Sequence, residues 1–266
     1  LNITGINITM SGLAIHPKGV QFKPDIDIPD LTGKIICITG GTAGIGKAAL
    51  LSLVKHNPGH IVFTGRNAAK AKEVILEARK ISPVTVTFLE CDLSSLQSVT
   101  AAAKQFLADF DKLDILFANA GIMAVPPGLT KDGYEVQFGT NHMGHALLLK
   151  YLLPLMAKTA ATGRDVRLVT TSSSAFQGAS GITFDTIKTP QNKLFTTIST
   201  RGKYLTPEEG AYNMCWVATT KRENLVNGTY YEPVGWPGTM TKVSQDNVLR
   251  DQLWDWTQKE LEGFCI

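Results

Sequence analysis

Short runs of apolar residues alternate with longer helix-type segments from residue 34 to residue 171, and this alternation constrains the fold more than any other feature. Strands are predicted where the apolar runs fall, at residues 34–39, 60–64, 85–90, 115–118 and 167–171. Helical spacing of apolar residues follows at residues 45–55, 68–81, 96–110 and 141–153. Strands that alternate with helices form βαβ units, and the resulting parallel sheet is covered by helices on both faces. The sequence therefore predicts a doubly wound α/β fold.

The two ends of the chain follow this rhythm less well. Residues 1–30 are interrupted by three prolines and are predicted to form an irregular N-terminal arm, whereas residues 31–266 are predicted to form a single domain. Residues 175–205 are rich in Thr, Ser, Gly and Pro and carry no strand pattern, although so long a structureless loop is uncommon in a compact domain. Regular structure is predicted again further on, as helices at residues 207–218 and 246–261 and a strand at residues 230–234.

Composition excludes other classes of protein. The 266 residues are 44% hydrophobic and 18% charged, with a net charge of +3 that is not gathered into the basic stripe of a nucleic-acid-binding protein. The apolar runs are too short to span a membrane. The four cysteines are far apart and form no CxxC pair, which argues against a zinc knuckle or a disulfide framework. A cytoplasmic, reducing location is the expectation.

A glycine-rich turn follows the first predicted strand of the alternating region. Residues 39–46 read Thr-Gly-Gly-Thr-Ala-Gly-Ile-Gly. Glycines at such a turn let the backbone approach a pyrophosphate, and the N-terminus of the next helix favours the negative charge. A tight strand-to-helix turn without a ligand is the alternative. Because the cluster occupies the first turn of a βαβ series, it predicts a dinucleotide site in a Rossmann-type sheet.

This turn resembles the cofactor motif of the short-chain dehydrogenase/reductase family. Three further stretches match the family in order: Asn119-Ala120-Gly121, Asn141, and the Val-Thr-Thr-Ser-Ser run that ends at Ser173. The resemblance covers residues 31–174, and residues 206–262 resemble the C-terminal part of fungal members. It implies an NAD(P)-binding Rossmann domain and hydride transfer between a nicotinamide cofactor and a small-molecule carbonyl or alcohol. A homo-oligomer is left open.

The resemblance and the physics together assign the cofactor-binding residues. Arg66 ends the second strand, where an acidic residue would bind the ribose of NAD, so we expect its guanidinium to bind the 2′-phosphate of NADP. NAD remains the alternative cofactor, and a solvated Arg66 is the alternative role. Asp92 is placed to meet the adenine amino group or, alternatively, to cap a helix. The full predicted set is Thr39, Gly40, Thr42, Gly44, Ile45, Gly46, Arg66, Asp92, Leu93, Asn119, Ala120 and Gly121.

Two residues are predicted to take part in catalysis. By resemblance, Ser173 hydrogen-bonds the substrate carbonyl, with its neighbours Ser172 and Ser174 as alternatives. Asn141 would hold the water that relays protons. His142 and His145 lie three apart on one predicted helix, but they have no carboxylate or Cys partner at ligand spacing, so no metal site is predicted.

The family's catalytic acid is not found in this sequence. The family uses a Tyr with a Lys four residues later, which lowers the pKa of the phenol and holds the nicotinamide ribose. None of the six tyrosines has a Lys at that spacing. One strand–helix unit is also missing by the family pattern, and the gap falls between about Ser199 and Thr206. The sequence therefore predicts an oxidoreductase with impaired activity. The alternatives are an inactive nucleotide-binding or scaffold protein and a truncated splice or gene-model product.

Overall fold

The computed structural model describes the backbone of residues 4–9 and residues 15–191 and 205–264 in full. Its strands form one sheet in the order β4-β3-β2-β5-β6-β1-β7-β8. Within the described residues every strand pair is parallel except β7 with β8. The bounds are β1 (Thr4–Thr9), β2 (Ile35–Ile38), β3 (His60–Gly65), β4 (Val86–Glu90), β5 (Ile115–Ala118), β6 (Arg167–Ser172), β7 (Tyr230–Glu232) and β8 (Trp236–Pro237).

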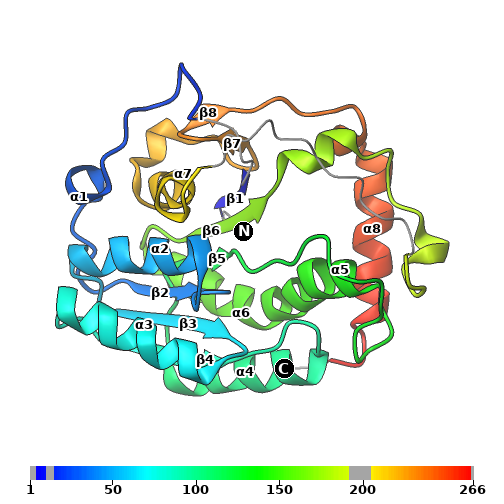
Figure 1. Ribbon diagram of the computed structural model, residues 1–266, viewed down its shortest axis with the longest axis horizontal. Coiled ribbons are helices and arrows are strands. Elements are labelled where there is room, and N and C mark those ends of the chain that lie inside the picture. Colours follow the sequence, from blue (N-terminus) through cyan, green and yellow to red (C-terminus); the bar gives the residue numbers. More distant parts are fainter. Residues whose placement is uncertain (1–3, 10–14, 192–204, 265–266) are drawn as a thin grey trace.

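Helices cover both faces of this sheet (Figure 1). One face packs against α2 (Gly44–Leu53), α3 (Ala68–Ile81) and α7 (Pro207–Thr219), and the other against α4 (Leu96–Asp109) and α6 (Gly144–Ala161). Successive strand residues point to opposite faces, so Ile36 and Ile38 enter the first core and Cys37 the second. The predicted doubly wound Rossmann-type fold is therefore confirmed. Three further helices are α1 (Pro24–Asp27), α5 (Val136–Phe138) and α8 (Asn247–Glu260).

Shorter helical segments connect these elements. A π-helical turn covers Gly139–Met143 and leads directly into α6. The 3-10 segments are Val54–His56, Ser174–Gly178, Phe184–Thr186, Arg222–Asn224 and Val243–Gln245. The polar region that follows β6 contains two of these 3-10 segments, Ser174–Gly178 and Phe184–Thr186. No strand occurs in the described part of that region. Residues 192–204, which include Tyr204 and most of the predicted gap between Ser199 and Thr206, lie outside the described residues.

The prediction of an irregular N-terminal arm is wrong for residues 4–9. They form β1, which lies between β6 and β7 in the sheet. It pairs with β6 from Thr4–Arg167 to Thr9–Ser172. It pairs with β7 at Asn7–Tyr230 and Ile8–Tyr231. The strand position that the sequence predicts to be missing beside β6 is thus taken by this segment. The physical reason is that the edge of β6 carries N–H and C=O groups that need partners. The β-branched residues of Thr-Gly-Ile-Asn-Ile-Thr suit a strand.

The C-terminal ends of the parallel strands meet along one edge of the sheet. Within the strand order, the chain turns one way from β2 toward β4 and the other way from β5 toward β6. Ligands of open α/β sheets bind at such a switch point. The edge beyond β2 and β5 is therefore the place to look for a site. Among the described helices, none is both long enough and apolar enough to cross a membrane.

Candidate cofactor and active site

The glycine turn after β2 has the backbone geometry of a pyrophosphate cradle. Gly40 and Gly44 have φ angles of 72° and 56°, in the left-handed region that favours glycine. A Cβ on Gly46 would collide with the carbonyl oxygen of Gly40 and lie 2.6 Å from Nδ2 of Asn119. A Cβ on Gly44, in contrast, would meet no atom within 4 Å. The turn is thus closed on its inner side and open on its outer side.

The helix that follows the turn begins without a side-chain cap. The residue before α2 is Ala43, whose methyl group cannot accept a hydrogen bond from the first N–H groups of the helix. These N–H groups and the positive end of the helix dipole face the open side of the turn. Ile45, in the first turn of α2, packs against Gly210 of α7 and fixes the helix start. The residues present fit a dinucleotide pyrophosphate.

A buried hydroxyl ties this turn to the end of β5. Oγ1 of Thr39 accepts hydrogen bonds from the backbone N–H groups of Asn119 (2.8 Å) and Ala120 (2.9 Å). Nδ2 of Asn119 donates in return to the carbonyl oxygen of Thr39 at 3.0 Å. Thr39 is completely buried. Three of the predicted cofactor residues therefore form one rigid unit at the switch point.

His145 completes this unit, a role that the sequence analysis missed. Its Nδ1 lies 2.9 Å from the carbonyl oxygen of Asn141, and its Nε2 lies 2.9 Å from Oγ1 of Thr39. A carbonyl can only accept, so Nδ1 carries the proton and Nε2 of the neutral ring accepts the Thr39 hydroxyl hydrogen. Burial lowers the pKa of His145 and keeps the ring neutral. A histidine on an apolar helix face, opposite a threonine that ends a buried strand, is the signal that could have predicted the pair.

The remaining predicted cofactor residues lie beside the turn on the β3–β4 side. Arg66 is exposed and follows Gly65, where an added Cβ would lie 2.7 Å from Cγ2 of Thr42. Within the described residues Arg66 forms no ion pair. Oδ1 of Asp92 accepts hydrogen bonds from the backbone N–H and the hydroxyl of Ser94, at 3.1 and 2.7 Å. Asp92 thus stabilises the turn before α4, whose N-cap is Ser95. The side chain of Leu93 is buried in the core.

The two predicted catalytic residues are held by the backbone near them. Oγ of Ser173 accepts from the N–H of Ala175 at 3.2 Å and caps the 3-10 segment that follows. Asn141, in the π-helical turn, accepts from the N–H of Ile122 at 2.9 Å and donates to its carbonyl oxygen at 2.8 Å. The loop that follows β5 and contains Gly121 is therefore anchored on Asn141. Single π-helical turns of this kind occur frequently at functional sites.

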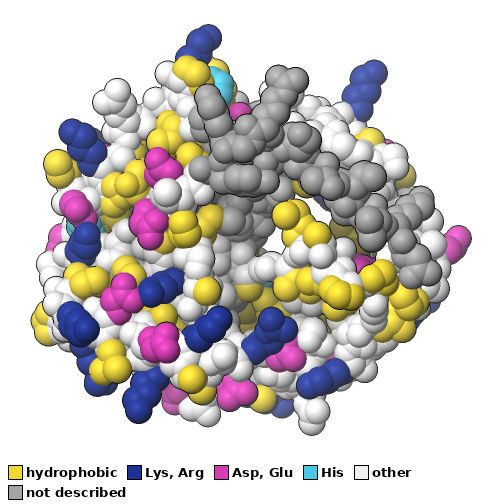
Figure 2. Space-filling model, in the orientation of Figure 1, with side chains coloured by type: hydrophobic (Ala, Val, Ile, Leu, Met, Phe, Trp, Pro, Cys, Tyr) yellow, Lys and Arg dark blue, Asp and Glu magenta, His cyan; other side chains and the backbone are white. Residues whose placement is uncertain are grey.

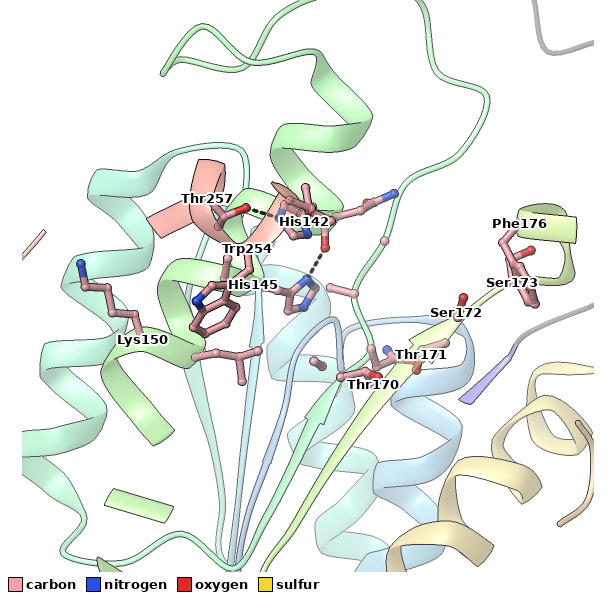
Figure 3. Close-up of a pocket in the computed structure, with 18 of the residues that line it drawn as sticks. His142, His145, Lys150, Thr170, Thr171, Ser172, Ser173, Phe176, Trp254 and Thr257 are labelled. Atoms are coloured by element: carbon pink, nitrogen blue, oxygen red, sulfur yellow. Dashed lines mark hydrogen bonds between the residues drawn. The ribbon is translucent and has the colours of Figure 1, made fainter. Parts of the chain in front are cut away.

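Both residues line a cavity of about 840 Å³ at the C-terminal edge of the sheet. Figure 3 shows Ser172 and Ser173 at the end of β6 on one side of this cavity, and Trp254 and Lys150 on the other. A helix is predicted from the sequence at residues 246–261, but its place at this cavity is not. Its contributions are Arg250, Leu253, Trp254, Thr257 and Gln258.

His142 connects the cavity floor to α8. Its Nε2 lies 2.9 Å from Oγ1 of Thr257, as Figure 3 shows. Burial, with a smaller contribution from the neighbouring His145, lowers the pKa of His142 to about 4. Both histidines thus serve hydrogen bonds of the fold. In the described part of the chain no three His, Cys, Asp or Glu side chains gather as metal ligands would.

The described residues do not bring a tyrosine and a lysine together in this cavity. No tyrosine is among its described lining residues, and Lys150 donates to the carbonyl oxygen of Leu261 at 2.6 Å. Tyr134 and Lys188 do meet elsewhere, with Nζ 5.7 Å from the ring centroid. There the hydroxyl of Tyr134 donates to Glu260 at 2.8 Å, and burial together with Glu260 raises the pKa of the phenol. That environment is the opposite of the one that makes a tyrosine a good acid.

The fold and the glycine turn define a nucleotide-binding α/β protein, and comparison with known sequences gives its family. Residues 34–184 match the family described as short chain dehydrogenase. The chain belongs to the short-chain dehydrogenase/reductase family of oxidoreductases, as its resemblance predicts.

The relatives include fungal proteins that align over most of both chains. A short-chain dehydrogenase/reductase of Armillaria gallica is 29% identical over 289 residues, covering 90% of this chain and 93% of the relative. One of Aspergillus calidoustus is 30% identical over 301 residues, covering 88% and 95%. Both alignments are longer than the 266-residue chain, so each relative carries residues that have no counterpart here. An uncharacterized oxidoreductase of Schizosaccharomyces pombe is 41% identical over 175 residues, which cover 64% of this chain and 51% of that protein.

Solved structures share the fold. An uncharacterized protein from Mycobacterium paratuberculosis superposes with a TM-score of 0.65 at 20% identity, covering 92% of this chain and 98% of that chain. The NADH-dependent reductase A1-R′ complexed with NAD gives a TM-score of 0.59 at 19% identity, covering 77% and 96%.

Proposed function

We propose that the chain binds NADP(H) and acts as a short-chain oxidoreductase that interconverts a carbonyl and an alcohol, with slow turnover. The single observation that carries the proposal is the turn at residues 40–46. Its inner side has no room for a side chain at Gly46, and its outer side leaves an uncapped helix start free for a pyrophosphate. Membership of a dehydrogenase family supports a nicotinamide cofactor.

Different residues of this chain bind different parts of NADP(H). The N–H groups at the start of α2 hold the pyrophosphate, and Arg66 pairs with the 2′-phosphate that distinguishes NADP from NAD. The unit of Thr39, Asn119 and His145 fixes the end of β5 beside the cofactor. When bound, NADPH supplies a hydride. The choice of NADP over NAD rests on Arg66, which is exposed next to the turn.

On the reaction side, Ser173 donates a hydrogen bond to the oxygen of the substrate carbonyl and holds it at the end of β6. Asn141 positions the loop after β5 through the backbone of Ile122. The proton that the product alcohol needs comes from water or from Tyr204, which lies outside the described residues; no described tyrosine lines the cavity. A positioned general acid contributes about 10²–10⁴ to a rate, so its replacement by water makes the reaction slow.

A second candidate function is nucleotide binding without catalysis. The turn at residues 40–46 supports this candidate equally, because it requires only the cofactor cradle. It does not require a tyrosine and a lysine to meet in the cavity, and no described pair does so. The two candidates share the first step, which is dinucleotide binding, and differ in whether any hydride transfer follows.

Cofactor choice tests the shared step. NADPH and NADH are titrated separately against the purified chain and followed by cofactor fluorescence. We expect tighter binding of NADPH, and inversion of this preference in Arg66→Asp, because a carboxylate repels the 2′-phosphate. Arg79→Asp is the matched control, since Arg79 is an exposed arginine in the last turn of α3 and the substitution changes the net charge equally. A wild-type chain that prefers NADH contradicts the role of Arg66, and a chain that binds neither contradicts the proposed function.

A further inference from the structure

The cavity extends beyond the residues that the proposed reaction uses. On one wall α6 contributes Ala146, Leu149 and Leu153, whose spacing of three and four places them on one face of that helix. On the other wall α8 contributes Leu253 and Trp254. Figure 3 shows Trp254 between Lys150 on one side of the view and Ser173 on the other. The space between the two helices is therefore an apolar groove that is continuous with the reaction site.

Most of the polar groups along this groove already have partners in the protein. Nζ of Lys150 donates to the carbonyl oxygen of Leu261, and His142 shares a hydrogen bond with Thr257. Arg250, near the start of α8, is paired with Asp251 at 2.8 Å. The polar groups left to meet a ligand are the hydroxyls near the end of β6 and the side-chain amide of Gln258 on α8. A ligand with hydroxyls along its whole length, such as a sugar, would lose hydrogen bonds to water in this groove without replacing them.

Two large apolar side chains at the groove are left in water. Trp254 is 61% exposed and Met123 is 66% exposed. Figure 2 shows a hollow in the molecular face between α8 and the sheet edge, bordered in part by hydrophobic side chains. A ligand that covers Trp254 and Met123 gains the free energy of their burial, and the flexible methionine adapts to its shape. A cavity of about 840 Å³ lies within the range of sites that enclose a whole ligand of drug size, about 300–1,000 Å³.

We infer that the groove between α6 and α8 binds the hydrocarbon chain of a long-chain alcohol or aldehyde whose oxygen lies at Ser173. The inference rests on the proposed function for the placement of that oxygen. It goes beyond that function by naming the substrate class as long and apolar, with one polar end. Specificity then comes from chain length, because the walls are mostly apolar, recognise methylene groups and offer few unpaired polar atoms along the groove.

Binding of primary alcohols measures this directly and without turnover. Butanol, hexanol, octanol and decanol are titrated into the full chain by calorimetry. Each added methylene that enters the groove strengthens binding about fourfold, so decanol binds at least 100-fold more tightly than butanol. Trp254→Gln weakens decanol binding about tenfold or more and leaves NADPH affinity unchanged. Val248→Gln is the matched control, because Val248 is a 66% exposed apolar residue of the same helix that does not line the cavity.

The outcomes separate the inference from the proposed function. Equal affinity for butanol and decanol, or wild-type decanol binding by Trp254→Gln, overturns the inference. If NADPH binds and chain length has no effect, the inference fails alone. If chain length matters and NADPH does not bind, the proposed function fails and the apolar site stands. Sedimentation in the same buffer tests whether a second copy of the chain fills the groove instead. If the wild type is a dimer that Trp254→Gln dissociates, and decanol does not bind, the second copy is the occupant and the inference is overturned.

Discussion

The two sides of the sheet edge differ in how completely their polar groups are paired. On the side of β2 and β5, the hydroxyl of Thr39 is bound by two N–H groups and a histidine, and Gly46 leaves no space for one added carbon. On the side of β6 and α8, a large cavity is walled by apolar residues, and Trp254 stands in solvent. The comparison teaches that holding a cofactor and reacting with a substrate are specified by different residues, so one can persist when the other is weakened.

Turnover is where we expect the largest difference between the two sides. The rate of NADPH oxidation with ketones and aldehydes should be lower by about 10²–10⁴ than in an enzyme with a positioned general acid. Absorbance of NADPH measures it, and fluorescence titration on the same sample shows that the cofactor is bound. Turnover in the ordinary range of about 1–10³ s⁻¹ would mean that a proton donor outside the residues described reaches the substrate, and the comparison would break.

A single methyl group in the turn tests the tightly packed side. Gly46→Ala places a Cβ against the carbonyl oxygen of Gly40 and 2.6 Å from Nδ2 of Asn119, so the backbone of the turn must move. Overpacking of this kind costs about 1–3 kcal/mol, and NADPH should bind about 5- to 150-fold more weakly if the bound turn carries that cost. Gly128→Ala is the control, because a Cβ there meets no atom within 4 Å. Unchanged NADPH affinity in Gly46→Ala would mean that the turn does not hold the cofactor.

Removal of the buried hydroxyl should destabilise the same side. In Thr39→Val the N–H groups of Asn119 and Ala120 lose their acceptor, and Nε2 of His145 loses its donor. Buried polar groups without partners cost about 1–3 kcal/mol each in unfolding free energy, which urea denaturation measures. Thr39→Ser keeps the hydroxyl and should retain most of the stability. Wild-type stability in Thr39→Val would show that these hydrogen bonds do not stabilise the fold.

Low pH should destabilise the side of β6 and α8 through His142, and this is the smallest of the expected effects. Burial lowers the pKa of His142 to about 4, so the folded ring is neutral while the unfolded ring takes up a proton near pH 6.5. At a pH between these two pKa values, unfolding is therefore accompanied by uptake of a proton. The free energy of unfolding has its highest value above pH 6.5 and falls as the pH approaches 4. The contribution of His142 is about 1–2 kcal/mol, because the ring is partly screened by solvent.

His142→Gln isolates this contribution from that of the other histidines. Burial also lowers the pKa of His56, His60 and His145, so the wild-type curve contains several titrations. Unfolding free energies of both proteins are compared from pH 7 to pH 4. The variant should lose less stability than the wild type over that range. Parallel curves would show that His142 is already hydrated in the folded protein.

The sequence predicts those parts of the molecule that local patterns determine. The strands from β2 to β6 lie where the alternation predicts them, and α3 coincides with residues 68–81, whereas α6 runs to Ala161, beyond its predicted end at residue 153. Family membership is confirmed, whereas the roles of the individual site residues stay predictions. β1 was missed because its strand conformation depends on an unpaired edge far away in the chain, which no local pattern records. The pairing of His145 with Thr39 and the position of Trp254 beside the site were missed for the same reason, since both depend on packing between distant elements.

The place of β1 in the sheet also has a consequence for the order of folding. Among the described strands β1 leaves the ribosome first, yet its partners are Arg167–Ser172 on one side and Tyr230 and Tyr231 on the other. Contacts between such distant residues close slowly compared with the βαβ contacts of β2 to β6. Synthesis at about 5–20 residues per second adds a delay of many seconds before β7 exists. Until β7 is made, the edge of β1 that β7 later covers is exposed on the nascent chain, and an exposed strand edge is the surface at which aggregation begins.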